Sequence, residues 1–129
     1  MSGRFLLDTN MIIAVFANEE AVTQKLADAE EVFVPSSALG ELYFGAGKSA
    51  RAKDNIARID ELSAGSAVLV CDALTAKLYG TIKNRLKMQG TPIPENDIWI
   101  AALAMQYQLT LVTGDRHFRV VEDLQVEQW

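Results

Sequence analysis

The sequence has almost none of the features that cross-link a protein chain or attach it to a membrane. Cys71 is the single cysteine among 129 residues, so no disulfide can form within the chain, and a reducing compartment such as the cytoplasm is expected. The apolar neighbours of Cys71 predict that it is buried as a small hydrophobic residue. No apolar run reaches the roughly 20 residues of a membrane span. The first residues also lack a basic segment followed by a long apolar one, so neither a membrane anchor nor a signal peptide is expected.

Surplus positive charge is missing as well. Lys and Arg number 12 against 17 Asp and Glu, which gives a net charge of −5. This balance disfavours a protein that holds nucleic acid by attraction over its whole surface. It is compatible with a basic partner, or with a site where metal ions reverse the local charge. Because half of the residues are hydrophobic and 22% are charged, we expect residues 1–129 to form one globular domain.

Short apolar runs alternate with helical patterns along the chain. We expect strands at residues 4–7, 32–34, 67–70 and 110–113, and a weaker one at 124–128. These runs are apolar throughout, as in strands covered on both faces. Strands that alternate with helices predict crossover connections and a mainly parallel sheet. The fold class is therefore α/β, a three-layer α/β/α sandwich.

The helical segments have recognisable ends. Asn18 is expected to cap a helix that has Glu19 and Glu20 in its first turn. Two apolar stripes, over 52–62 and 74–86, end at Gly65 and Gly90. The segment IWIAALAM at 98–105 is apolar on all sides, which predicts a buried helix.

Four acids from distant parts of the sequence are expected at one edge of this sheet. Asp8 directly follows the first strand, and Asp115 follows the 110–113 strand in VTGDRHF; ligands bind at this carboxyl edge of parallel sheets. Asp97 begins the buried helix, which must run antiparallel to the strand after it, so the start of the helix returns to the same edge. Glu41 lies in the early turns of the helix after the second strand.

Three of these acids also have a purely structural explanation. Asp8 can be the N-cap of the helix TNMIIAVF. Asp97 can complement the dipole of its helix. Asp115 can be a turn residue after a glycine. For each of the three residues, the sequence alone leaves open both this structural role and a role in ligand binding.

For Glu41 a structural role is hard to find, whereas for Asp72 a structural role is the simplest explanation. Glu41 shares a stripe with Ala38 and Leu42, where an acid facing the core needs a partner, unless this face is exposed. Asp72 follows a strand as Asp8 does, but together with Thr75 it is typical of a plain helix start.

Several acids in one cleft favour a bound cation. Unit charges about 4 Å apart repel by about 4 kcal/mol at an effective dielectric of 20, so the acids raise each other's pKa unless a cation intervenes. Oxygen ligands without histidine or cysteine suit Mg²⁺ or Mn²⁺. A metal held in this way can activate water and neutralise the charge that develops at phosphorus. The acids therefore predict phosphodiester hydrolysis.

The sequence resembles the PIN-domain family in four motifs, which in order are LLDTNMII, SSALGELYFGA, PENDIWIAALA and LVTGDRHF. More narrowly, it resembles the VapC-type toxins of bacterial toxin–antitoxin pairs, over essentially the whole chain. The resemblance implies a parallel sheet flanked by helices and a Mg²⁺- or Mn²⁺-dependent endoribonuclease that cleaves tRNA or other structured RNA. It also implies an antitoxin partner and a homodimer.

The resemblance assigns roles to individual residues. It makes Asp8, Glu41, Asp97 and Asp115 the metal-binding and catalytic acids, with Asp8 and Asp97 as the most direct ligands. Hydroxyl or amide groups surround the acids of the family at the positions of Thr9, Asn10 and Thr113. Some PIN proteins carry a further acid two positions after the one that matches Asp115; this chain has His117 there. A second metal position is therefore expected to be weak or empty, and His117 could contact RNA phosphate instead.

RNA and the antitoxin would need local surfaces. The candidate RNA-binding cations are Lys48, Arg51, Lys53, Lys83, Arg85, Lys87, Arg116 and Arg119. The cations at 83–87 can equally be a solvated helix face. By resemblance, an apolar groove for the antitoxin would involve Ile12, Val15, Phe16 and Tyr43 or Phe44, although from the residues alone these belong in the core.

Two other function classes compete with the nuclease. An aspartyl-phosphate phosphoryl-transfer protein also places an acid after its first strand; reaction with acetyl phosphate would identify it, but Asn10 stands where phosphatases of that kind want a second acid. The other is a binding module that kept the PIN scaffold and lost catalysis. An absence of Mn²⁺ binding in calorimetry would favour that module.

Overall fold

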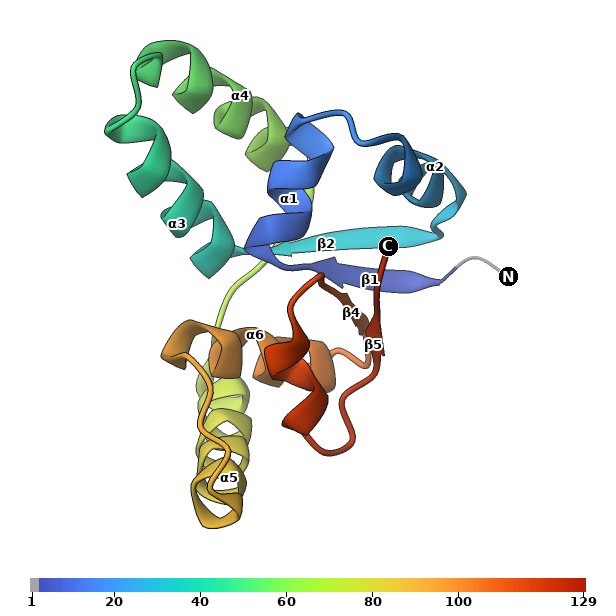
Figure 1. Cartoon of the computed structure of the whole chain (residues 1–129), viewed down its shortest axis with the longest axis vertical. Coiled ribbons are helices and arrows are strands. Elements are labelled where there is room, and N and C mark those ends of the chain that lie inside the picture. The colour runs from blue at the N-terminus through green and yellow to red at the C-terminus, as the bar shows by residue number, and fades with distance from the viewer. Residues whose placement is uncertain (1–2) are drawn as a thin grey trace.

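The computed structural model describes residues 3–129, and its centre is a five-stranded sheet (Figure 1). The strands are β1 (Arg4–Leu7), β2 (Glu31–Pro35), β3 (Ala67–Leu69), β4 (Thr110–Val112) and β5 (Val126–Glu127). They lie in the order β3-β2-β1-β4-β5, and every neighbouring pair is parallel. The expected parallel sheet and its five strands are confirmed, with ends that differ by one or two residues.

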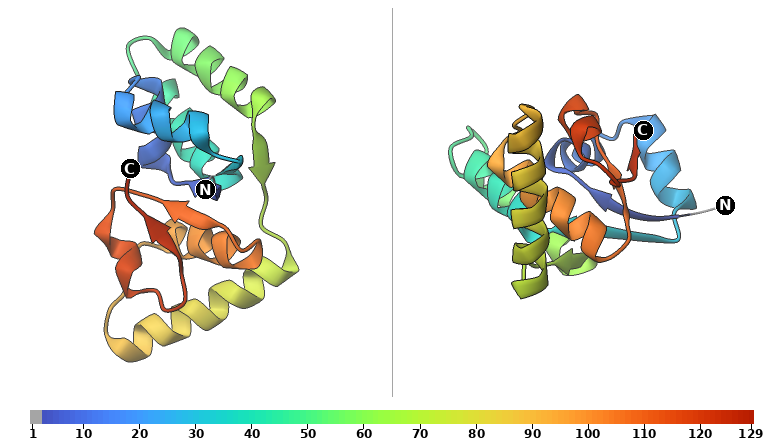
Figure 2. Two further views of the ribbon diagram at one scale, coloured as in Figure 1. Left: turned by 90° about the vertical axis from the view of Figure 1, so that its right-hand side faces the viewer. Right: turned by 90° about the horizontal axis from the view of Figure 1, so that it is seen from below.

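Helices cover both faces of this sheet. They are α1 (Thr9–Phe16), α2 (Glu20–Asp28), α3 (Ser36–Gly47), α4 (Ala52–Gly65), α5 (Ala73–Gln89) and α6 (Glu95–Gln106), with a short 3₁₀ helix η1 (Arg116–Val120). Helices α1 to α4 lie on one side of the sheet, and α5, α6 and η1 lie on the other (Figures 1 and 2). The three-layer α/β/α sandwich is therefore confirmed. Within residues 3–129, no helix combines the length and the apolar character that crossing a membrane requires.

Each layer of helices has its own hydrophobic core. Leu6 and Leu111 pack with α5, α6 and η1, whereas Leu7 and Val112 pack with α1, α3 and α4. Successive side chains of a strand point to opposite faces, so strands buried on both faces are apolar at every position. The unbroken apolar runs of the sequence are explained by this arrangement.

The two helices that follow the third strand form as predicted. Helix α5 ends at Gly90, whose φ of 72° is the left-handed conformation that glycine adopts most readily. Helix α6 is buried through its middle, at Ile98 and from Ile100 to Ala104. It connects to β4 and so directs its first turn toward the carboxyl edge of the sheet.

Two local predictions are wrong. Asn18 does not cap α2: its φ is 56° and its N–H donates to the carbonyl of Val15, so it ends the turn after α1, and Glu19 takes the N-cap position. Cys71 is exposed. Strand β3 ends at Leu69, so Val70 and Cys71 belong to the link between β3 and α5 rather than to the core.

Candidate metal centre

Asp8 lies at the junction of β1 and α1, and only 5% of its surface is exposed. Its Oδ1 accepts a hydrogen bond from the backbone N–H of Met11 at 2.9 Å, which confirms the N-cap prediction. Its Oδ2 accepts a hydrogen bond from the hydroxyl of Thr113. Capping the helix and facing the sheet edge are therefore compatible roles, because each is served by a different oxygen.

Thr113 connects Asp8 to the end of the neighbouring strand. Thr113 follows β4, which pairs with β1, and its side chain is buried. Its hydroxyl oxygen accepts a hydrogen bond from the N–H of Asp115 at 2.9 Å while it donates to Asp8. Asp115 in turn caps η1, because its Oδ1 accepts from the N–H of His117 at 3.0 Å. One hydroxyl thus connects two of the four acids.

Asp97 enters from the opposite side of the site, in the first turn of α6. Its Oδ2 lies 3.2 Å from Nδ1 of His117, and Oδ2 of Asp115 lies 3.0 Å from the same nitrogen. These three ligand atoms all lie within 4.8 Å of one another. Within residues 3–129, they are the group whose spacing matches the ligands of a single metal ion.

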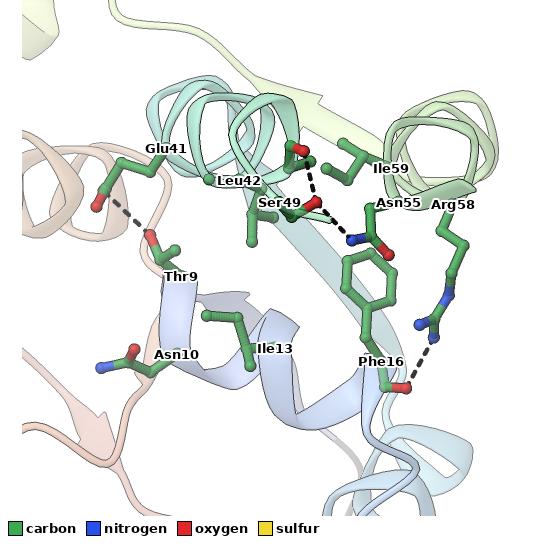
Figure 3. Close-up of a pocket in the computed structure, with 12 residues that line it drawn as sticks. Thr9, Asn10, Ile13, Phe16, Glu41, Leu42, Ser49, Asn55, Arg58 and Ile59 are labelled. Atoms are coloured by element: carbon green, nitrogen blue, oxygen red, sulfur yellow. Dashed lines mark hydrogen bonds between the residues drawn. The ribbon is translucent and has the colours of Figure 1, made fainter. Parts of the chain in front are cut away.

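Glu41 lies in the second turn of α3 and is exposed. Of the two possibilities that the sequence left open for Glu41, a core-facing acid or an exposed helix face, the structure has the exposed face. Its Oε1 accepts a hydrogen bond from the hydroxyl of Thr9 at 3.1 Å (Figure 3). The same oxygen accepts from the side-chain amide of Asn96, which precedes Asp97 on α6. Glu41 is therefore held at the site by hydrogen bonds from two other helices.

The acids influence one another electrostatically. Burial raises the pKa of Asp8, and the charges of Asp97 and Asp115 raise it further, against the hydrogen bonds from Thr113 and Met11 that lower it. Burial also raises the pKa of Asp97, as do the charges of Asp115 and Glu41, against the lowering effect of His117. The charges of the other acids therefore reach Asp8 and Asp97: Asp97 and Asp115 act on Asp8, and Asp115 and Glu41 act on Asp97.

The supporting residues fall into two groups. Thr9 and Thr113 contact acids directly, as described, whereas Asn10 is exposed at the start of α1. The contact of Asn96 with Glu41 and the bridging position of His117 were both missed from the sequence. The spacing of His117, two residues after Asp115, was the available signal.

Asp72, the acid that geometry alone could not exclude, serves a helix. Its Oδ1 accepts from the N–H of Thr75 at 3.1 Å, and its own N–H donates to the hydroxyl of Thr75 at 3.0 Å. This reciprocal arrangement is a capping box at the start of α5, so the helix-start prediction is confirmed.

Several of the candidate RNA-binding cations are engaged with acids. Lys83 lies 2.9 Å from Glu95, and Arg51 lies 3.0 Å from Asp54. Arg85 lies 3.9 Å from acids that follow η1. These contacts agree with the alternative that the cations at 83–87 form a solvated face.

A groove of about 430 Å³ runs between α1, α3 and α4, with Glu41 at one end (Figure 3). Its apolar lining includes Ile13, Phe16, Leu42 and Ile59, and its polar end near the acids is formed by Thr9, Asn10 and Glu41. Of the residues expected in such a groove, Phe16 lines it. Ile12 is fully buried in the core, Tyr43 donates a hydrogen bond to Asp60, and Ile13 and Leu42 were not anticipated.

Comparisons with known proteins give one consistent family. The sequence matches the PIN domain family over residues 5–124. It is 36% identical to Ribonuclease VapC2 of Haemophilus influenzae over 129 residues, which covers 98% of both chains. It is 33% identical to the tRNA(fMet)-specific endonuclease VapC of Shigella flexneri, again over 98% of both. Its fold matches DNA-bound VapBC from Salmonella typhimurium with a TM-score of 0.89 and 30% identity, over 100% of this chain and 99% of the other.

Proposed function

Because the chain belongs to the PIN domain family, and within it to the VapC ribonucleases, we propose that it is a metal-dependent endoribonuclease toxin that hydrolyses RNA at Asp8, Glu41, Asp97 and Asp115. The match over residues 5–124 supports treating the chain as a single nuclease domain. The observation that carries the proposal is the meeting of these acids at one edge of the sheet, where Asp97, Asp115 and His117 place ligand atoms within 4.8 Å of one another. Burial, and then the charges of the neighbouring acids, raise the pKa of Asp8 and Asp97.

The donor set at this edge fits a divalent cation. Carboxylate oxygens dominate it, and such hard donors suit Mg²⁺ or Mn²⁺. A bound cation would also offset the burial and repulsion that raise the pKa of Asp8 and Asp97, because a nearby positive charge favours the ionised form of an acid. We propose Asp8, Asp97 and Asp115 as the principal ligands. A divalent metal in this place supplies the positive charge that activates water and neutralises the reacting phosphate.

The residues of the chain prepare the site for that chemistry. The hydrogen bonds of Asp8 to Met11 and Thr113 fix its carboxylate before any substrate arrives. Thr9 and Asn96 hold Glu41 at the rim of the site, where its exposed carboxylate is placed to orient the attacking water and to accept its proton. Such preorganisation avoids the cost of arranging the groups during the reaction.

We propose structured RNA, with tRNA as the first candidate, as the substrate. The name of the Shigella flexneri relative, a tRNA(fMet)-specific endonuclease, supports this choice. Since the net charge is −5, local cations have to contact the phosphates. Arg116 and Arg119 are candidates, because both lie on η1, the short helix that Asp115 caps. The extended contact of a folded RNA would bring several phosphates within reach of such cations.

The proposed activity is tested with Asp97→Asn, which keeps the size of the side chain and removes its charge. Cleavage of total RNA is mapped with Mg²⁺ or Mn²⁺ for the wild type, for this variant and for Asp28→Asn, the same change at an exposed acid on α2. We expect Asp97→Asn to abolish cleavage with an unchanged circular dichroism spectrum, and Asp28→Asn to cleave normally. Undiminished metal-dependent cleavage by Asp97→Asn would refute the assignment of the site.

We also propose that the groove between α1, α3 and α4 receives a segment of the cognate antitoxin. The fold matches DNA-bound VapBC of Salmonella typhimurium and VapBC-5 of Mycobacterium tuberculosis, a member of the VapBC family of toxin–antitoxin systems. The groove combines an apolar floor with one acidic end at Glu41. This lining fits an amphipathic segment that carries a basic residue at one end. Homodimerisation stays a prediction from the family resemblance.

Ile13→Asp tests the groove, because Ile13 is 50% exposed and lines it, so that a charge there need not unfold the protein. We expect antitoxin binding to weaken by about tenfold or more, since apolar anchors at interface centres carry much of the affinity. Met88→Asp is the matched control at an exposed residue of α5. Equal affinity of both variants for the antitoxin, measured by calorimetry, would place the antitoxin elsewhere.

A further inference from the structure

We propose that Nδ1 of His117 is a direct ligand of the metal, and that it gives the site a preference for Mn²⁺ and similar transition-metal ions over Mg²⁺. This inference rests on the proposed metal-dependent function and concerns which residues hold the ion. His117 is the one histidine of the sequence, and its ring lies between the carboxylates of Asp97 and Asp115. The chain therefore has its single imidazole at the place where a metal is expected.

Backbone hydrogen bonds, and not only the side-chain contact, hold the Cα of His117 beside Asp115. Asp115 caps η1 through the N–H of His117 at 3.0 Å, and Thr113 holds the N–H of Asp115 at 2.9 Å. Phe118, the next residue of η1, is buried in the core of the α5–α6 layer. The backbone of the short helix is thus anchored on both sides of the histidine, which keeps the start of its side chain within reach of both acids.

The distances in the cluster match those between ligands on one ion. Metal–ligand bonds of about 2.1 Å that meet at right angles put neighbouring donor atoms about 3.0 Å apart. Nδ1 of His117 lies 3.0 Å from Oδ2 of Asp115 and 3.2 Å from Oδ2 of Asp97. The same separation suits a hydrogen bond from Nδ1–H to a carboxylate, so an ion can take the place of the proton with little movement of the side chains.

The ring also satisfies the second requirement of a metal-binding imidazole. Coordination through Nδ1 needs the proton on Nε2, and that N–H needs an acceptor. The side chain of His117 is about half exposed, with 49% of its surface accessible, so water can accept this hydrogen bond.

A nitrogen ligand changes which metals the site prefers. Mg²⁺ favours oxygen donors and keeps much of its water, whereas imidazole suits Mn²⁺ and the later transition metals. The acid that some PIN proteins carry at this position would add negative charge and one more oxygen. His117 adds neither, so it lowers the attraction for Mg²⁺ relative to a metal that binds nitrogen.

Two variants and one control separate a ligand from a merely supporting residue. His117→Gln removes the imidazole, and His117→Asp replaces it with a carboxylate. Glu122→Gln is the control, because Glu122 is exposed and lies just beyond η1. The protein is prepared without added histidines, so that any imidazole signal from a bound metal belongs to His117 alone.

The first measurement is electron spin echo modulation of the Mn²⁺-loaded protein, which detects ¹⁴N bound to the metal. We expect ¹⁴N modulation in the wild type and in Glu122→Gln, and none in either His117 variant. The second is calorimetric titration with Mn²⁺ and Mg²⁺. Loss of a residue that only holds a metal ligand in position costs about tenfold or more in metal affinity. Because His117 is proposed as a ligand itself, we expect His117→Gln to weaken Mn²⁺ binding at least that much and Mg²⁺ binding far less. We expect His117→Asp to bind Mg²⁺ better, relative to Mn²⁺, than the wild type does.

The outcomes distinguish this inference from the function on which it rests. Binding of Mn²⁺ to the wild type without ¹⁴N modulation would overturn the ligand assignment and leave the proposed nuclease intact. An equal loss of affinity for both metals in His117→Gln would also overturn it, because that pattern belongs to a residue that only orients Asp97 and Asp115. Binding of neither metal would overturn the metal-dependent function itself.

Discussion

Neutralising Asp97 is expected to stabilise the metal-free protein, although it removes a proposed catalytic group. The carboxylate of Asp97 is largely buried, and its pKa is raised first by this burial and then by the charges of Asp115 and Glu41. Asp97→Asn removes the charge and keeps an oxygen that can accept a hydrogen bond from Nδ1 of His117. The variant therefore loses repulsion while it retains the local contact.

The size of the effect follows from the geometry of the cluster. Carboxylate oxygens of Asp97 and Asp115 lie within 4.8 Å of each other, and at that separation unit charges repel by about 3.5 kcal/mol for an effective dielectric of 20. This value is a ceiling, because His117 lies between the two acids and solvent reaches the site. We expect a net gain of about 1 kcal/mol in the free energy of unfolding, or about 3–5 °C in Tm for a chain of this size.

The assay is thermal unfolding in EDTA and then with saturating Mn²⁺, for the wild type, Asp97→Asn and Glu30→Gln. Glu30 is an exposed acid in the link between α2 and β2, and serves as the control. A metal at about 100 times its Kd adds about 2.7 kcal/mol to the stability of a protein that binds it. The wild type should gain this amount and Asp97→Asn less, so the order of their Tm values should reverse.

The pH dependence gives an independent check. The folded-state pKa of Asp97 is raised above its ordinary value of 3.8, so the folded protein binds this proton more tightly than the unfolded chain. The stability of the metal-free wild type with respect to this group is therefore highest below pH 3.8, and falls as the pH rises to the folded-state pKa. The advantage of Asp97→Asn should grow over the same interval. A variant that is less stable than the wild type in EDTA at neutral pH would refute the reasoning.

Two further changes probe helix α5. Gly80→Ala should raise the free energy of unfolding by about 0.5–1 kcal/mol, because Gly80 lies inside the helix with open space where a Cβ would stand. Gly90→Ala should lower the free energy of unfolding by about 1 kcal/mol, because Gly90 has a φ of 72°. Urea unfolding measures both, and equal signs would contradict the conformational argument. The hydrogen bonds from Thr75 and Gln106 lower the pKa of Asp72 below 3.8. Asp72→Ala should therefore destabilise the protein above that pH, and the difference from the wild type should shrink as acid protonates Asp72; a difference that persists at low pH would exclude the carboxylate as its source.

The central sheet could be predicted because its strands are covered on both faces. Residues 4–7 and 110–113 are apolar at every position, and each such run became a strand, β1 and β4. Helix α6 was predictable for the same reason, since an all-apolar helix has to be buried. The exposure of Cys71 was not predictable, because it depends on whether β3 ends one or two residues earlier.

The sequence predicts which residues lie on the same face of a helix more easily than it predicts whether that face is buried or exposed. Glu41 lies on the same stripe as the buried Ala38, yet Glu41 is exposed, and its carboxylate accepts hydrogen bonds from Thr9 and Asn96 on two other helices. Asn18 has the side chain of a helix start, but the same residue type also adopts the left-handed conformation that ends a helix. Only the tertiary structure selects between these uses.

The acids of the candidate site were predictable from topology, but their partners were not. Asp8 and Asp115 follow parallel strands, whose carboxyl ends must meet at one edge. The contact between His117 and Asp97 joins residues 20 positions apart and depends on the turn of η1. The contact between Asn96 and Glu41 likewise depends on how α6 meets α3. Sequence periodicity contains no information on such crossings.

Thr9 and Glu41 line the apolar groove and also belong to the acidic site, and their hydrogen bond spans the boundary between them. Where an occupant of the groove shifts this hydrogen bond and so changes the affinity for the metal, the two ligands are thermodynamically linked. Whatever factor an occupant of the groove imposes on metal affinity, the metal must impose on the occupant in return. The affinity of an inhibitor that binds this groove would then depend on whether the metal is bound. The cellular concentration of the metal would therefore influence how much of the toxin is inhibited.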